Sequence, residues 1–255
     1  MIEDAKVSTI LEKYPRTFNR TYIHKYFSDM KKIIDNMSVK DIDRVIEFLF
    51  SAWKEDRTIF TMGNGGSAST ATHFACDLSK CTIVEGEKRF KVICLNDNIP
   101  LMSALVNDEG FDNLFSEQLK NLMRPGDVLI GISVHGGSGE DKAGLWSQNL
   151  LKAMMLTKEE YDGVTIGFSG FDGGAMKQMA DACIVVPFNS TPHVESFHLV
   201  FEHLICSCLK EKIKAYTSEQ DQKIAYEPDQ MTDSEEITEF ALNTESGDDQ
   251  SGIFR

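Results

Sequence analysis

The chain has 255 residues, of which 42% are hydrophobic and 26% charged, a composition typical of an ordinary globular protein with a sizeable core. Its formal net charge of −14 argues against nonspecific nucleic-acid binding, because neutralising phosphates requires a basic surface. No apolar run approaches the ~20 residues of a membrane-spanning helix and the start, MIEDAKVST, resembles no targeting signal, so we expect a cytoplasmic protein that does not enter a membrane.

Two amphipathic helices are predicted ahead of the main domain. In residues 17–37, apolar side chains recur at steps of three or four residues, as on one face of a helix. A second helix is predicted to begin at Ser38, where Asp41 gives a pattern similar to a capping box ahead of an apolar stripe. The pattern is compatible with packing in the core and with an oligomer interface, and it does not choose between them.

The chain then changes to short apolar strands that alternate with segments of helix length. The predicted strands are 58–62, 90–95, 127–133, 163–168 and 182–187. Such alternation predicts an α/β fold with a five-stranded parallel sheet flanked by helices. In such sheets, ligands bind beyond the carboxyl ends of the strands, so we search the loops that follow them.

We divide the chain into an N-terminal helical pair (1–56), an α/β domain (57–216) and an acidic tail (217–255). From Thr217 onward, 11 acidic residues accompany two basic ones and few apolar ones. The composition is compatible with a solvated, disordered extension. A segment that docks loosely around residues 237–242 is the alternative.

Two loops rich in small residues are candidates for binding a phosphate group. The first contains Gly65, Gly66 and Ser67 before a predicted helix, whose backbone N–H groups and N-terminus favour an anion. The second, Ser133 to Gly139, adds hydroxyl groups and the imidazole of His135 at the same edge of the sheet. For the first loop, the alternative is a plain tight turn. This loop also matches the loose dinucleotide-binding motif G-x-G-x-x-A, but the acidic residue expected after the second strand is missing. For the second loop, the alternative is a flexible surface loop.

Histidines and carboxylates on two predicted helices form a candidate metal site. His73 and Asp77 are four residues apart and share a helix face. Glu195 and His203 lie eight apart on the last helix, about 80° apart around its axis. Ordinary packing explains any one of these residues, whereas both pairs together would suit a borderline divalent ion such as zinc.

Several segments carry a resemblance to a known family. In chain order they are GNGGSASTATHFACDLS, LNDNIPLMSALVNDEGFDNLFSEQL, RPGDVLIGIS, FDGGAMKQMADACIVVP and VESFHLVFEHLIC. Together they resemble the phosphoheptose isomerase (sedoheptulose 7-phosphate isomerase) family, which has the sugar isomerase, or SIS, fold. The resemblance covers residues 22–212 and leaves out the acidic tail.

The resemblance implies a homotetramer with the N-terminal helices at its subunit contacts and active sites shared between subunits. The implied reaction is the isomerisation of sedoheptulose 7-phosphate to D-glycero-D-manno-heptose 7-phosphate, which feeds lipopolysaccharide or capsule synthesis. It would proceed through an enediolate, with Zn²⁺ polarising the carbonyl. No nucleic acid or membrane is an expected partner.

The resemblance also assigns roles by position. The residues expected to bind the phosphate are Ser67, Ser133 and Ser138, with Gly65, Gly66 and His135 in the same loops. Asn64, Asp97 and Asn98 are expected to line the sugar site. The zinc ligands would be His73, Asp77, Glu195 and His203. Of these, Asp77 and His203 also fall on the family's acid–base pair, and Glu195 is a further catalytic candidate.

The chain departs from the family at several of these positions. Asp77 stands where the family has glutamate, and Glu195 where it has glutamine. Val134 and His135 replace two hydroxyl-bearing residues of the second loop, and Cys81 stands where an arginine contacts substrate. We expect a metal-dependent sugar-phosphate isomerase. The alternative is a noncatalytic SIS module that binds a phosphosugar or a protein partner, similar to the relative that binds the bacterial replication initiator.

Overall fold

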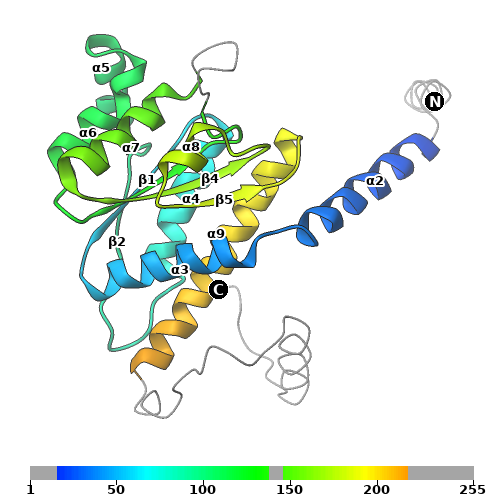
Figure 1. Cartoon of the computed structure of the whole chain (residues 1–255), viewed down its shortest axis with the longest axis horizontal. Helices are drawn as coiled ribbons and strands as arrows, with labels where there is room; N and C mark the ends of the chain where they lie inside the picture. The colour runs from blue at the N-terminus through cyan, green and yellow to red at the C-terminus, as the bar shows by residue number, and fades with distance from the viewer. Residues whose placement is uncertain (1–15, 138–145, 218–255) are drawn as a thin grey trace, which may run out of the picture. The chain divides into compact units, whose positions relative to one another are not determined.

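The computed structural model describes residues 16–137 and 146–217 (Figure 1). Its helices are α2 (Arg16–Ile34), α3 (Val39–Lys54), α4 (Gly66–Lys80), α5 (Ile99–Asp108), η1 (Phe111–Asn113), α6 (Leu114–Leu122), α7 (Gln148–Tyr161), α8 (Gly174–Met179) and α9 (Thr191–Thr217). Its strands are β1 (Thr58–Gly63), β2 (Lys91–Cys94), β3 (Val128–Ile132), β4 (Val164–Gly170) and β5 (Ala182–Val186). Each predicted strand is confirmed to within a few residues.

The strands form one parallel sheet in the order β2-β1-β3-β4-β5. The predicted five-stranded parallel α/β fold is therefore confirmed. The chain begins the sheet at β1, adds β2 on one side and then crosses to β3 on the other. Gly63 at the end of β1 is in register with Ile132 at the end of β3, so the loops after these two strands emerge side by side. Ligands of doubly wound folds bind at this kind of switch point.

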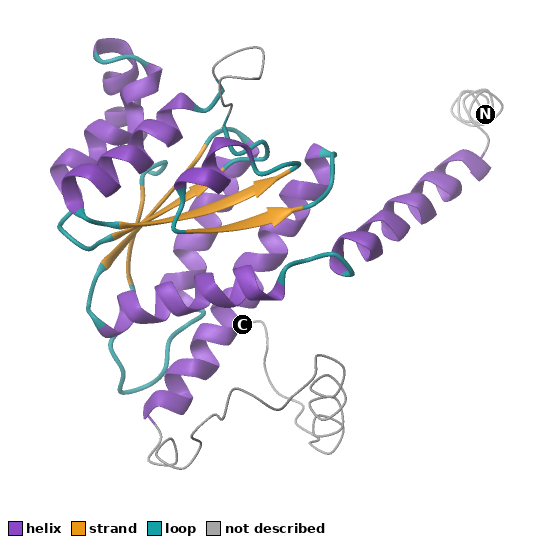
Figure 2. Ribbon diagram, in the orientation of Figure 1, coloured by secondary structure: helices purple, strands orange, loops and turns teal. Residues whose placement is uncertain are grey.

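Helices cover both faces of the sheet, as the apolar character of the strands requires (Figure 2). One face is packed by α3, α4 and α9, which contribute Leu49, Phe74 and Ile205 to a common core. The opposite face is packed by α6, α7 and α8, with Phe115 and Met154 among the buried side chains. The first of these layers brings α4 and α9, the carriers of the predicted metal ligands, onto the same face.

The predicted start of the second helix is confirmed by its cap. The Ser38 hydroxyl accepts a hydrogen bond of 3.2 Å from the backbone N–H of Asp41, which satisfies one of the free donors at the start of α3. The first helix ends at Ile34, three residues before the predicted end, because the chain turns there before entering α3.

The predicted apolar stripe of α2 is only partly covered. Ile33 is buried, and Tyr26 stacks on His193 of α9 with 3.9 Å between ring centroids. Phe18, Tyr22 and Phe27 are exposed. In the part of the chain that the structure describes, no helix combines the length and apolar character that crossing a bilayer needs. Both alternatives for the acidic tail concern residues after Thr217, which lie outside the described ranges.

Candidate functional site

A cavity of about 150 Å³ lies at the carboxyl ends of β1 and β3. Its lining residues are Asn64, Ser67, Ile132, Ser133, Val134, His135, Trp146, Ser147 and Glu195. Four of the residues predicted to bind substrate, namely Asn64, Ser67, Ser133 and His135, are thus brought together. The side-chain amides of Asn64 and Asn149 hold the cavity wall through reciprocal hydrogen bonds of 3.0 and 2.9 Å.

The glycines before α4 allow this loop to approach a ligand closely. Gly65 has φ of +56°, a conformation that a residue with a side chain rarely adopts. At Gly66, an added methyl group would collide with the carboxylate of Glu195. The carboxylate of Glu195 therefore lies against the N-terminus of α4, whose partial positive charge attracts an anion.

Asp97 and Asn98 lie elsewhere in this chain. They line a separate hollow of about 460 Å³ beside β2, α5 and α6. Asp97 accepts a hydrogen bond of 3.2 Å from the Thr72 hydroxyl, and the side chain of Asn98 caps α5 by accepting from the N–H of Leu101 at 3.1 Å. The structure does not bring these two residues into the first cavity, and Ser138 lies outside the described residues.

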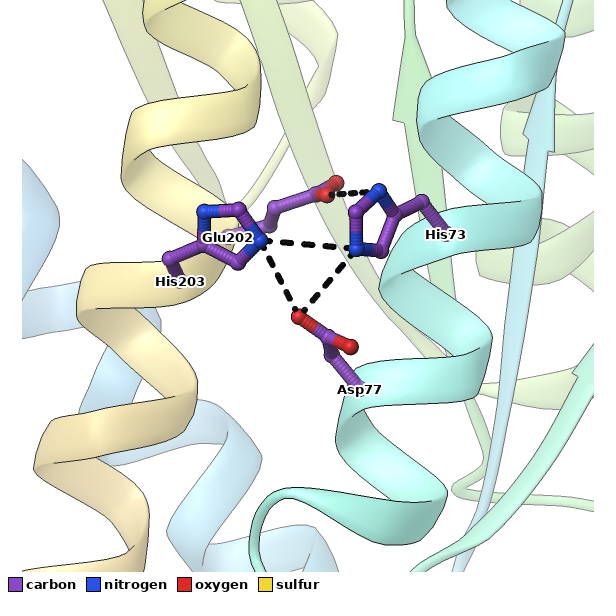
Figure 3. Close-up of side chains that lie close together, drawn as sticks. All are labelled: His73, Asp77, Glu202 and His203. Atoms are coloured by element: carbon purple, nitrogen blue, oxygen red, sulfur yellow. Dashed lines mark hydrogen bonds and ion pairs between the residues drawn. The ribbon is translucent and has the colours of Figure 1, made fainter. Parts of the chain in front are cut away.

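A second group of polar side chains lies between α4 and α9 (Figure 3). Nε2 of His73, Oδ2 of Asp77 and Nε2 of His203 form a nearly equilateral triangle, with sides of 3.3, 3.4 and 3.5 Å. We call these three residues the ligand triangle. A point near its centre lies about 2 Å from each corner, which is the bond length of zinc to imidazole nitrogen and carboxylate oxygen. The donor set and its spacing therefore fit a zinc ion.

The ligand triangle is open to solvent on one side. The side chains of His73 and His203 are 44% and 51% exposed, whereas that of Asp77 is only 10% exposed. Oδ1 of Asp77 stays outside the triangle and accepts a contact of 3.5 Å from the Cys81 thiol. Burial and the neighbouring Asp77 raise the pKa of this thiol. A catalytic zinc site typically has three protein ligands and one open position, and this arrangement is of that kind.

Glu202 is the residue that sequence reasoning missed. Its carboxylate is completely buried, and Oε1 lies 3.4 Å from Nδ1 of His73. Burial, and to a lesser extent the charge of Asp77, raises the pKa of Glu202 to about 8. The spacing in the sequence was a signal: Glu202 lies four residues after His198 and four before Cys206, so the three share a helix face, and the structure buries all of them.

Glu195, predicted as the fourth zinc ligand, lies at the cavity instead of in the group around the ligand triangle. The reason is helix geometry. Eight residues of α-helix advance about 12 Å along the axis, so Glu195 and His203 reach different places although both lie on α9. Glu202, which is next to His203, is the carboxylate of α9 within this group.

The cavity and the ligand triangle lie along the same pair of helices, α4 and α9. At one end Gly66 of α4 contacts Glu195 of α9, and at the other Asp77 contacts His203. Both helices therefore run in the same direction between the two ends. His73 lies six residues, or about 9 Å of helix rise, beyond Ser67.

Comparison with known proteins shows the family to which this chain belongs. The family model described as SIS domain matches residues 22–141. The phosphoheptose isomerase of Geotalea daltonii is 34% identical over 194 residues, which cover 76% of this chain and 95% of that protein. The chain belongs to the phosphoheptose isomerase family.

Two further relatives complete the comparison. The lincomycin biosynthesis protein LmbN of Streptomyces lincolnensis is 39% identical over 188 residues, covering 72% of this chain and 67% of that protein. The structure of phosphoheptose isomerase GmhA from Neisseria gonorrhoeae superposes with a TM-score of 0.65 and 27% identity, covering 75% of this chain and 98% of that one. The predicted resemblance and SIS fold are confirmed.

Proposed function

We propose that this protein catalyses the interconversion of an aldose and a ketose phosphate, and that its substrate is sedoheptulose 7-phosphate. The observation that carries this proposal is the ligand triangle and the cavity, which lie along the same two helices, α4 and α9. The named activities of the family members support it, since the relatives from Geotalea daltonii and Neisseria gonorrhoeae are phosphoheptose isomerases.

Substrate binding would begin at the cavity. The hydroxyls of Ser67 and Ser133 and the N-terminus of α4 would hold the phosphate. Glu195 also borders this cavity and, among its described lining residues, none is Lys or Arg. We therefore assign the Glu195 carboxylate to the sugar hydroxyls beyond the phosphate, where it would accept hydrogen bonds. Binding energy at this end positions the carbonyl end for reaction.

Proton transfer would take place at the other end. Moving a carbonyl from C2 to C1 requires removing a proton from the adjacent carbon, passing through an enediolate, and returning a proton to the neighbouring carbon. We assign the first step to the carboxylate of Asp77, whose Oδ1 lies outside the ligand triangle, and proton delivery to the imidazole of His203. Glu195 is the other candidate for the base, and mutation of each carboxylate tests which of them removes the proton.

The same residues would hold a metal ion. His73, Asp77 and His203 fit zinc in spacing and chemistry, and bound zinc would supply a Lewis acid that polarises the substrate carbonyl. Because two of the three corners also take part in proton transfer, loss of the metal and loss of turnover are expected together.

The test is incubation with sedoheptulose 7-phosphate in deuterated water with added zinc, followed by NMR. Formation of heptose 7-phosphate with deuterium at the carbon that exchanges its proton would support the isomerase and its enediolate route. Binding of the phosphosugar with neither product nor label would contradict the proposal and favour the noncatalytic SIS module. Protein purified without chelator is expected to contain zinc.

We further propose a homotetramer in which α2 forms subunit contacts. Phe18, Tyr22, Ile23 and Phe27 lie on α2 and are each at least half exposed. A helix with this many exposed large apolar side chains is typical of a protein–protein interface. The four-subunit assembly is the one that membership in the family suggests.

A further inference from the structure

The two nitrogens of the His73 ring face two different carboxylates (Figure 3). Nε2 lies 3.5 Å from Oδ2 of Asp77 and 3.4 Å from Nε2 of His203, at a corner of the ligand triangle. Nδ1 lies 3.4 Å from Oε1 of Glu202. The ring therefore stands between the triangle and the buried carboxylate.

The buried carboxylate of Glu202 has few polar neighbours. Its side chain is fully buried, and neither carboxylate oxygen forms a hydrogen bond with the described residues. A buried carboxylate is costly unless a donor or a charge faces it. In the described part of the chain, the polar group that faces it as an ion-pair partner is the imidazole of His73.

We infer that Glu202 is a positioning residue: by facing Nδ1 of His73 at 3.4 Å it favours a proton on that nitrogen and so keeps the lone pair of Nε2 directed into the ligand triangle. A neutral imidazole carries one proton, so fixing it on Nδ1 makes Nε2 the metal-binding atom. Carboxylates behind metal-binding histidines fix the tautomer and ring orientation in this way. The metal part of this inference rests on the proposed function, whereas the tautomer of His73 can be measured without metal.

The alternative is that Glu202 is itself a ligand, since one of its carboxylate oxygens lies within 4.8 Å of a donor atom of each other residue of the group. The ring geometry favours positioning. The lone pairs of Nδ1 and Nε2 point away from each other, and Glu202 lies on the Nδ1 side while Asp77 and His203 lie on the Nε2 side.

The experiment compares Glu202→Gln, which keeps an oxygen acceptor, with Glu202→Met, which has similar volume and no comparable acceptor. Glu211→Gln is the matched control, because Glu211 is an exposed glutamate of the same helix that pairs with Lys214. The tautomer of His73 is read in metal-free, ¹⁵N-histidine-labelled protein by long-range NMR correlations, at a pH where the imidazole is neutral. Its signals are assigned by their loss in His73→Gln. Zinc affinity is measured by competition with a chelating dye.

We expect the Nδ1–H tautomer in the wild-type protein, in Glu202→Gln and in Glu211→Gln, and a shift toward Nε2–H in Glu202→Met. Zinc affinity should fall by about 10- to 100-fold in Glu202→Met, and by less than about tenfold in Glu202→Gln. A role of Glu202 in folding alone would not move the tautomer of His73 in a variant that remains folded.

Two results would overturn the inference. An Nε2–H tautomer in the wild-type protein would do so without any variant, even if Glu202→Met fails to fold. An unchanged tautomer in folded Glu202→Met, with equally large losses of zinc affinity in both Glu202 variants, would identify Glu202 as a direct ligand. If the wild type shows the expected tautomer but binds no zinc, the metal part of the proposed function fails while the positioning of His73 stands.

Discussion

Nε2 of His203 lies 3.3 Å from Oδ2 of Asp77, although 126 residues separate the two in the chain. The contact exists because α4 and α9 pack on the same face of the sheet, where Phe74 and Ile205 belong to one core. The reactive end of the site therefore depends on tertiary packing and on neither helix alone.

Asp77→Asn is expected to remove most of the turnover. The amide is a poor base and a weak metal ligand, so kcat for sedoheptulose 7-phosphate should fall by at least about 100-fold, and zinc content should fall with it. Both are measured on the same preparation. Asp43→Asn, at an exposed position of α3, is the control and should keep both values.

Glu195→Gln distinguishes the role of Glu195 from that of Asp77. Because Glu195 lies at the cavity and outside the group around the ligand triangle, we expect its loss to change KM more than kcat, with kcat within about tenfold of the wild type. Steady-state kinetics beside Asp77→Asn make the comparison. Equal, small losses in both variants would contradict the assignment of Asp77 as the base.

Ser67→Ala and Ser133→Ala are expected to weaken the hold on the phosphate. A hydrogen bond to a charged group contributes about 1.5–3 kcal/mol, so each variant should raise KM by at least about tenfold with kcat less affected. Ser103→Ala, on the exposed surface of α5, serves as the control. An unchanged KM in both cavity variants would mean that the phosphate binds elsewhere.

His198 is expected to make the protein sensitive to acid. Its Nε2–H donates to the carbonyl of Ser169 at 3.1 Å, and burial lowers its pKa to about 4. The unfolded chain takes up this proton near pH 6.5 and the folded one only near pH 4, so stability falls as the pH falls between these values.

The expected loss is about 3 kcal/mol at the acid end of that window. Glutamine can keep the donor to Ser169 but does not titrate, so His198→Gln should lack this part of the pH dependence. Urea unfolding at a series of pH values measures it, with His24→Gln at an exposed position as the control. The same slope in wild type and His198→Gln would show that other groups cause the acid sensitivity.

Phe27→Glu and Ile23→Glu test the proposed subunit contacts of α2. Both side chains are exposed in the single chain, so a charge there should cost little in folding but should disfavour an apolar interface. Light scattering coupled to size-exclusion chromatography is expected to show species smaller than the tetramer proposed for the wild-type protein. Lys31→Glu, a polar change on the same helix, should leave the assembly intact, and a monomeric wild type would refute the proposal directly.

Local patterns were enough to predict most of the fold. The strands are short and apolar because helices cover both faces of the sheet, and Ser38 acts as the helix cap that its spacing from Asp41 indicates. The end of α2 and the exposure of Phe18 and Phe27 were not predictable. Periodicity predicts that a helix has an apolar face, but it does not predict which part of the protein packs against that face.

The site was predictable in part. His73 and Asp77 share a helix face at a spacing of four residues, and the structure brings both to His203. The resemblance assigns Glu195 to the zinc ligands, whereas in this chain it lies at the cavity, eight residues or about 12 Å of helix rise before His203. Glu202 was missed because a charged residue on a helix is ordinarily taken to point toward solvent, whereas the side chain of this one is fully buried.

Helix α9 carries Glu195, Glu202 and His203 on one uninterrupted segment. Their relative placement is therefore fixed by the register of a single helix. One residue inserted between Glu195 and Glu202 would turn everything beyond it by about 100° and shift it by about 1.5 Å, so that Glu195 could not keep its contact with Gly66 while His203 keeps its contact with Asp77. We therefore expect that evolution of this site can exchange side chains along α9 far more readily than it can change the length of the segment between them.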